Sequence, residues 1–308
     1  MRKASYSVQA SSAVVMVRPH HFTVNTETAI DNRFQAPGET GEHLAAQAYR
    51  EITHAAQTLE AHGVRVHLFE DEGTSTPDSV FPNNWFSTHA GGHVAIYPMK
   101  AESRRRERRS DIVEMLKTAY RVQDIIDYSG LEPDGLYLEG TGAMVLDHID
   151  RVAYAVRSDR TNPIALERFS THFNFEPMVF EAMDETGASI YHTNVLMCVA
   201  THFAMIGLEM ISDRRRRDEI VMRLENSGRQ IIALSNDQIR RFAGNALELQ
   251  GREGRILALS TTAMRALRED QLAVIGESAE PVALDIPTIE KAGGSVRCTL
   301  AGIHLPRR

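Results

Sequence analysis

One pattern of secondary structure recurs five times along this chain of 308 residues. The first copy has an apolar strand at 13–19, a helix at 43–63 and a second strand at 64–70. Apolar residues in that helix recur every three or four positions, which keeps them on one face until the helix stops at Gly63. Strands that alternate with helices in this way indicate an α/β fold built from repeated units.

The other four copies follow the same order of strand, strand, helix and strand. Their strands are expected at 79–89, 93–99, 123–128, 135–148, 151–158, 176–183, 189–200, 202–211, 230–235, 255–260, 282–287 and 293–306. Their helices are expected at 111–120, 163–173, 213–227 and 263–275, with an inserted helix at 237–249 that begins at a capping box of Ser235 and Gln238.

Five ββαβ-like units favour a closed, pseudo-fivefold α/β-propeller over an open sheet, because a closed ring has no exposed sheet edges. Such a ring also brings the same strand end of every unit to a common axis. We therefore predict one catalytic domain over residues 1–308, in which residues 1–12 are extended or disordered.

The composition excludes several classes of function. A hydrophobic content of 43% and a net charge of −7 are ordinary for a soluble globular protein and argue against nucleic acid as a partner. The longest apolar stretch, 194–211, contains polar residues and is a poor membrane span. No signal peptide is evident at the N-terminus, so a cytoplasmic protein is expected. The arginine-rich runs 104–109 and 214–217 are typical of solvated helix starts.

The chain has two cysteines, Cys198 and Cys298. A structural disulfide is not expected in the cytoplasm, and no spacing typical of a zinc site accompanies the two thiols. Cys198 lies within an apolar run, which predicts a core residue. Cys298 follows Gly293 and Gly294, where the backbone can turn sharply or approach closely.

Clusters of polar residues interrupt predicted strands that are otherwise apolar and expected in the core. They contain Asp78, Asn83, Asn84, Glu139, His192, Asn194 and Cys298. Each has an ordinary structural explanation when taken singly. Together, a cysteine, a histidine and a carboxylate on separate units could supply a nucleophile, a proton shuttle and an orienting acid.

The motifs PDSVFPNNWFSTH, YLEGTG, YHTNV and SVRC resemble those of the guanidino-group-modifying superfamily, and most closely its citrulline utilisation hydrolase branch. This resemblance covers 14–306 and implies a five-bladed α/β-propeller with a Cys–His–acid site. It implies Cys298 as nucleophile, His192 as general acid/base and Glu139 as the carboxylate that works with that histidine. No metal or organic cofactor is implied.

The resemblance also implies residues that bind the substrate. Asp78 matches an acid near the substrate, and Arg160 and Arg104 match arginines that grip the substrate carboxylate, a task suited to their bidentate geometry. Asn83, Asn84 and Asn194 stand where related guanidinium-binding enzymes carry acids. A neutral ureido group offers both donors and acceptors to an amide, so these asparagines favour citrulline or another ureido compound.

Several alternatives stay open at this point. They are an arginine deiminase or dihydrolase, a dimethylarginine hydrolase, an amidinotransferase and a catalytically silent binding protein. The expected partner is a small amino acid with a guanidino or ureido group, and the sequence does not decide whether the protein is a homodimer. Loops at 39–41 and 91–92 are candidates to close over the site.

Overall fold

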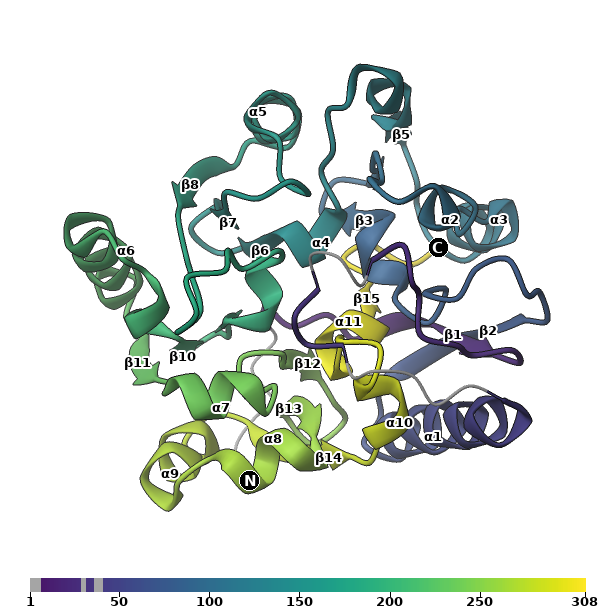
Figure 1. Ribbon diagram of the computed structural model, residues 1–308. Coiled ribbons are helices and arrows are strands. Elements are labelled where there is room, and N and C mark those ends of the chain that lie inside the picture. The colour runs from purple at the N-terminus through teal and green to yellow at the C-terminus, as the bar shows by residue number, and fades with distance from the viewer. Residues whose placement is uncertain (1–6, 29–31, 36–40) are drawn as a thin grey trace.

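Five three-stranded sheets surround a common axis in the computed structural model, which describes residues 7–28, 32–35 and 41–308 (Figure 1). In each sheet, the middle strand pairs antiparallel with the inner strand and parallel with the outer strand. From the inner to the outer strand, the sheets are β15 (Ala301–Gly302), β1 (Ala13–Pro19) and β2 (Arg65–Asp71); β3 (Phe86–His89), β4 (His93–Ile96) and β5 (Asp124–Asp127); β6 (Met144–Asp147), β7 (Val152–Val156) and β8 (Glu176–Phe180); β9 (Met197–Val199), β10 (Phe203–Ile206) and β11 (Gln230–Ala233); and β12 (Leu247–Gln250), β13 (Arg255–Ser260) and β14 (Glu280–Leu284).

Helices connect each middle strand to its parallel outer strand, as a parallel crossover requires. They form the outer layer of the ring in Figure 1. These helices are α1 (Glu42–Ala61), α3 (Ser110–Ala119), α5 (Pro163–Phe173), α6 (Arg214–Asn226), and the pair α8 (Thr261–Ala266) and α9 (Glu269–Gly276). Shorter helices are α2 (Glu102–Arg105), α4 (Gly140–Ala143), α7 (Asn236–Arg240), α10 (Pro287–Glu290), α11 (Val296–Thr299), η1 (Pro82–Asn84), η2 (Ser129–Asp134), η3 (Thr193–Val195) and η4 (Leu208–Met210).

The last strand closes the ring. β15 pairs with β1, with Val14 opposite Gly302 and Val15 opposite Ala301, so the C-terminal segment completes the first sheet. The predicted closed, fivefold α/β arrangement is confirmed. The prediction that placed 293–306 in the fifth unit is wrong, because the sequence pattern cannot show which strand the segment pairs with.

Further predictions need correction. The segment 79–89 is not one strand, because Pro82 begins the 3-10 helix η1 before β3. The segments 135–148, 189–200 and 293–306 are not single strands either, because α4, η3 and α11 precede β6, β9 and β15. The predicted helix 237–249 stops at Arg240, and its end forms β12; the capping box at Ser235 is confirmed. The helix predicted at 263–275 divides into α8 and α9, because Leu267 and Arg268 adopt extended backbone angles.

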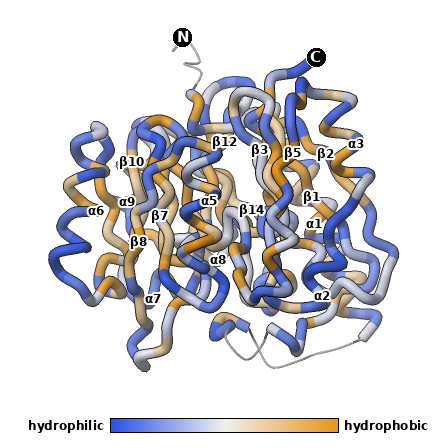
Figure 2. Tube along the Cα trace, turned by 90° about the horizontal axis from the view of Figure 1, so that it is seen from above, coloured by the Kyte–Doolittle hydropathy of each residue, from blue (hydrophilic) through white to orange (hydrophobic). Residues whose placement is uncertain are grey.

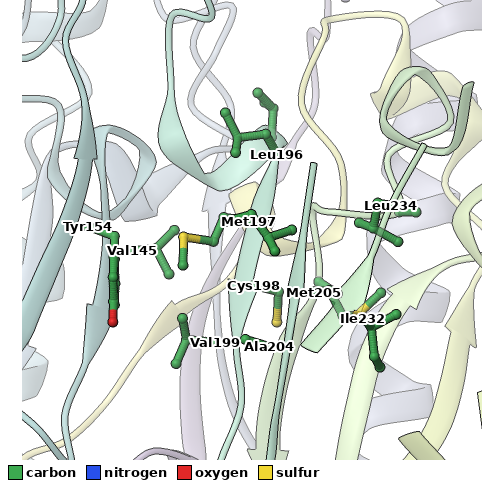
Figure 3. Close-up of a cluster of buried hydrophobic side chains, with 14 of the residues drawn as sticks. Val145, Tyr154, Leu196, Met197, Cys198, Val199, Ala204, Met205, Ile232 and Leu234 are labelled. Carbon is green, nitrogen blue, oxygen red and sulfur yellow. The ribbon is translucent and has the colours of Figure 1, made fainter. Parts of the chain in front are cut away.

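The core lies between the sheets and their helices. Figure 3 shows part of it, where Cys198 of β9 lies among residues such as Val145, Met197 and Met205. Cys198 is 3% exposed, and burial raises the pKa of its thiol to about 12. The prediction that Cys198 is a core residue is confirmed. In Figure 2, outer helices such as α6 alternate polar and apolar segments along their length.

A buried ion pair joins the third and fourth units. Arg229 donates from Nη1 and Nη2 to the carboxylate of Asp147 at 2.7 and 2.8 Å, and both side chains are almost fully buried. Residues 7–12 also pack against the core: the buried side chain of Gln9 donates to the carbonyl oxygens of Leu146 and Val199. This part of the N-terminal segment is therefore anchored.

Within the described residues, no helix is both long and apolar enough to cross a membrane.

Candidate active site

Six of the nine predicted site residues lie on equivalent turns, each just before the innermost strand of a sheet; Asp78, Arg104 and Arg160 lie on other segments. η1 precedes β3, α4 precedes β6, η3 precedes β9, a turn at 241–245 precedes β12, and α11 precedes β15. Asn84 ends η1, Glu139 immediately precedes α4, His192 immediately precedes η3, and Cys298 lies in α11. The fivefold arrangement therefore brings residues that are far apart in sequence to one end of the axis.

A small cavity at this end is lined by six of the nine predicted residues. They are Asp78, Asn84, Arg104, Arg160, His192 and Cys298. Glu139 lies directly behind His192, and Asn194 behind Cys298. Asn83 is fully buried but does not line the cavity, and neither end of its side-chain amide has a hydrogen-bond partner among the described residues.

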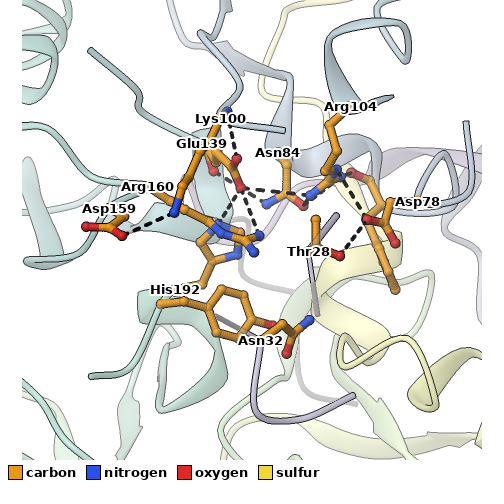
Figure 4. A network of polar contacts seen from close by, with 12 residues as sticks. Thr28, Asn32, Asp78, Asn84, Lys100, Arg104, Glu139, Asp159, Arg160 and His192 are labelled. Atoms are coloured by element: carbon orange, nitrogen blue, oxygen red, sulfur yellow. Dashed lines mark hydrogen bonds and ion pairs between the residues drawn. The ribbon is translucent and has the colours of Figure 1, made fainter. Parts of the chain in front are cut away.

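Glu139 and His192 form a buried pair. His192 Nε2 lies 2.8 Å from Glu139 Oε2, and both side chains are almost fully buried (Figure 4). Burial opposes ionisation of Glu139, but Arg160, His192 and Arg104 outweigh it and hold its pKa well below the usual value. Burial lowers the pKa of His192 to about 4, although Glu139 acts in the opposite direction.

This electrostatic balance fixes the role that each ring nitrogen can take. Since Glu139 is ionised and can only accept, the neutral His192 carries its hydrogen on Nε2. Nδ1 is then the basic nitrogen. A Cβ placed on Gly142 would lie 2.8 Å from Nδ1, so the missing side chain of Gly142 leaves room for this ring.

Arg104 and Arg160 both approach Glu139, but they have different surroundings. Arg104 donates to Glu107 at 3.0 Å and to Asn84 Oδ1 at 3.3 Å, and it is 2% exposed. The expectation of a solvated helix start is therefore wrong for Arg104, because neighbouring carboxylates compensate its buried charge. Arg160 Nη1 lies 3.3 Å from Glu139 Oε2, and its guanidinium lies over the ring of Tyr191 at 4.8 Å.

Asp78 is held at one side of the cavity. Its Oδ2 accepts from Asn25 at 2.8 Å and from Thr28 at 3.3 Å, and lies 3.8 Å from Arg104 Nε. Its buried Oδ1 has no hydrogen-bond partner among the described residues. Since Asp78 lines the cavity, its carboxylate is a candidate acceptor for a ligand.

The thiol of Cys298 receives two amide donors. Asn194 Nδ2 and Asn245 Nδ2 each lie 3.2 Å from Sγ. A Cβ at Gly294 would lie 3.2 Å from Cys298 Cβ and 2.8 Å from the Phe81 ring. The close approach predicted for this glycine is therefore confirmed.

Sequence reasoning missed several residues of the site. Thr28 and Asn32 come from the polar loop between β1 and α1, and its unusual length was a usable signal. Tyr191 lines the cavity and donates to the Gly293 carbonyl oxygen at 2.8 Å. Asn245 was hidden inside the predicted helix 237–249, although its Asn-Ala-Leu sequence matches the Asn-Val-Leu sequence at Asn194.

The candidate lid loop at 91–92 lies away from the cavity. Gly91 and Gly92 form the turn between β3 and β4, at the end of β3 that lies away from η1 and the site. Of the other loop, Glu39 and Thr40 lie outside the described residues.

No group of three or more His, Cys, Asp and Glu side chains that could hold a metal ion is found over 7–28, 32–35 and 41–308.

Comparison with known protein families identifies the family of this chain. Residues 18–305 match the model of the eukaryotic N,N dimethylarginine dimethylhydrolase family. The chain belongs to this family. As a member of the dimethylarginine dimethylhydrolase family, it is a hydrolase that acts on C–N bonds other than peptide bonds, within the guanidino-group-modifying superfamily. No curated protein gives a significant match to the sequence.

Solved structures share the fold. The N-terminal domain of a cyanobacterial arginine dihydrolase, ArgZ, bound to its product is 17% identical with a TM-score of 0.75, and the match covers 96% of this chain and 98% of that one. AgrE with ornithine and NAD+ is 19% identical with a TM-score of 0.75, over 96% of this chain and 40% of that one. A dimethylarginine dimethylaminohydrolase adduct with S-methyl-L-thiocitrulline is 16% identical with a TM-score of 0.63, over 97% and 100%.

Proposed function

We propose that the protein hydrolyses the ureido group of citrulline to give ornithine, ammonia and carbon dioxide, with Cys298 as nucleophile. The observation that carries the proposal is the surroundings of this thiol. Asn194 and Asn245 donate to Sγ, and Asn84 contributes a further amide to the cavity. Amides can donate to and accept from a neutral ureido group, whereas a cationic guanidinium is bound more strongly by carboxylates.

The charged residues of the cavity suit the amino-acid end of the substrate. Arg160, whose guanidinium lies over the Tyr191 ring and lines the cavity, would bind the α-carboxylate together with Arg104. Asp78 Oδ1, the buried acceptor in the wall, is suited to the α-ammonium group. Asn84 then faces the ureido end, and Asn83 supports it from behind.

The chemistry proceeds in two steps. The sulfur of Cys298 attacks the ureido carbon while its proton passes to His192, whose Nδ1 is the basic nitrogen. His192 returns a proton to the terminal nitrogen, which leaves as ammonia, and the carbon stays bonded to sulfur as a thiocarbamate. Water, deprotonated by His192, then attacks this carbon and releases the thiol together with an N-carboxyl ornithine. That product loses carbon dioxide to give ornithine.

Glu139 has a positioning role in this scheme. Its ionised carboxylate accepts from Nε2 at 2.8 Å, so it holds the ring and stabilises the imidazolium that forms during each step. The scheme uses only groups of this chain and water.

An arginine dihydrolase is the second candidate. The structural likeness to ArgZ favours it, since ArgZ is an arginine dihydrolase. The same thiol and histidine would convert arginine to bound citrulline and then continue to ornithine. A cytoplasmic location stays a prediction.

The deciding experiment offers the purified protein citrulline, arginine, dimethylarginine and agmatine separately, and measures ammonia, citrulline, ornithine and dimethylamine. Ornithine and ammonia from citrulline, without turnover of the other three, is the expected result. Ornithine from arginine would select the dihydrolase instead. Dimethylamine from dimethylarginine would overturn the preference for a ureido substrate.

A further inference from the structure

We propose that Asn245 is a catalytic residue that, together with Asn194, forms a two-amide hole for the negative charge of the Cys298 sulfur. The inference rests on the proposed role of Cys298 as nucleophile. Asn245 is fully buried, and its Nδ2 lies 3.2 Å from Sγ.

The orientation of the Asn245 amide is fixed by a second contact. The same Nδ2 donates to the backbone carbonyl oxygen of Asn194 at 2.9 Å. A carbonyl oxygen can only accept, so the NH2 end of the Asn245 side chain must face this point. The group that faces the sulfur is therefore a donor.

The local fold holds Asn245 in this position. Phe242 has a left-handed φ of 61°, which turns the chain sharply after α7. A Cβ on Gly244 would lie 2.7 Å from the Val195 carbonyl oxygen, so only glycine allows this approach. The Asn245 carbonyl oxygen in turn accepts from Arg297 N at 3.2 Å, which ties the turn to the helix that carries Cys298.

The position also follows the internal symmetry of the ring. A residue two or three positions before each innermost strand faces the axis. These residues are Asn84, Gly142, Asn194, Asn245 and Cys298. Asn194 and Asn245 belong to the fourth and fifth units, and both donate to the thiol that stands at the equivalent position before β15.

A negatively charged Cys298 sulfur requires hydrogen-bond donors beside it. His192 is neutral at physiological pH, because burial lowers its pKa to about 4, so no imidazolium faces the sulfur in the resting protein. A buried negative charge is unfavourable unless hydrogen-bond donors compensate it. N–H donation to an anion is roughly twice as strong as donation to a neutral acceptor, so the two amides can compensate the negative charge that the sulfur carries when it attacks.

Both asparagines also retain a buried Oδ1 that has no hydrogen-bond partner among the described residues. An unsatisfied buried acceptor costs about 1–3 kcal/mol. A side chain placed only for stability would avoid that cost, which is consistent with a functional role for the donors.

The test measures the thiolate directly, without substrate. The absorbance of the protein at the thiolate band is titrated with pH and compared with its Cys298→Ser variant, so that tyrosines cancel. The expected midpoint of this difference moves upward by about one pH unit in Asn245→Ala, which removes one donor. Asn245→Asp, nearly isosteric but anionic, should shift it further, and kcat should fall about tenfold or more in both variants.

Ser235→Ala is the matched structural control. It removes the cap of α7 and loosens the same turn but keeps both amide donors, so its midpoint should equal that of the unmodified protein. The proposal is overturned if Asn245→Ala keeps the original midpoint, or if Ser235→Ala reproduces the shift. Failure of the proposed function would appear separately, as unchanged turnover in Cys298→Ser.

Discussion

At Gly142, one added methyl group would collide with side chains of the site, because these side chains lie close together at the axis. A Cβ there would lie 2.0 Å from Asn84 Nδ2 and 2.8 Å from His192 Nδ1. Gly142→Ala must therefore displace a substrate-binding amide, the proposed base, or both. We expect kcat to fall by about 100-fold or more, as an ångström-scale misplacement of catalytic groups does, and the free energy of unfolding to fall by about 1–3 kcal/mol.

Gly130→Ala is the control for this variant, because a Cβ at Gly130 would meet nothing within 4 Å. Steady-state kinetics and denaturant unfolding should leave Gly130→Ala indistinguishable from the unmodified protein. A fully active Gly142→Ala protein would show that Asn84 and His192 are not held against each other as described.

Single residues also explain why the sequence predicted the site only in part. Glu139, His192 and Cys298 were found because a polar residue beside a buried strand is unusual. Asn245 was missed because Ser235 and Gln238 start a genuine helix, and the following apolar residues continue its spacing. The left-handed turn at Phe242 ends that helix by tertiary packing, which no local pattern records.

At the scale of elements, the outer helices are stabilised by local caps that are remote from the site. Asn162 caps α5 by accepting from Ile164 N at 2.9 Å. Asn162→Ala removes this acceptor and should lower the free energy of unfolding by about 1 kcal/mol. Thermal unfolding should show a decrease of about 2 °C, while kcat stays unchanged.

Glu167→Ala serves as the comparison within the same helix, since Glu167 is exposed in the middle of α5. Its melting temperature should stay the same or rise slightly, because alanine has the higher helix propensity. Equal losses in both variants would contradict the capping role of Asn162.

The strands and long helices could be predicted because their apolar periodicity is local. The position of β15 could not, because a strand of two residues carries no pattern of its own and pairs with β1, at the opposite end of the sequence. The division of α8 from α9 was missed for a related reason. Leu267 preserves the helical spacing of apolar residues while its backbone is extended.

For the whole molecule, buried histidines couple stability to pH. Burial lowers the pKa of His192 and His304 to about 4, and those of His89 and His148 well below the usual value. In the unfolded chain these groups bind protons below pH ~6.5, whereas the folded protein does not until about pH 4. Stability is therefore complete above pH ~6.5 and is lost progressively as the pH falls toward 4.

The loss for His192 alone should reach up to about 2 kcal/mol at pH 5. Buried carboxyls whose pKa is raised by desolvation, such as Glu51 and Glu248, oppose this trend, but the four histidines outweigh them. Denaturant unfolding between pH 7 and 4.5 should show a steep decrease in the free energy of unfolding. His148→Phe should flatten the slope, and a profile independent of pH would contradict the neutral burial of these rings.

The central claim is that Cys298 forms a covalent bond to the substrate carbon. The most direct measurement is the mass of the Cys298 peptide after the protein is mixed with citrulline and quenched in acid. The account predicts an increment equal to the substrate minus ammonia on Cys298, none on Cys198, and a longer-lived adduct in His192→Ala if that variant still acylates. An unmodified Cys298 throughout turnover, with Cys298→Ser retaining the original rate, would contradict it.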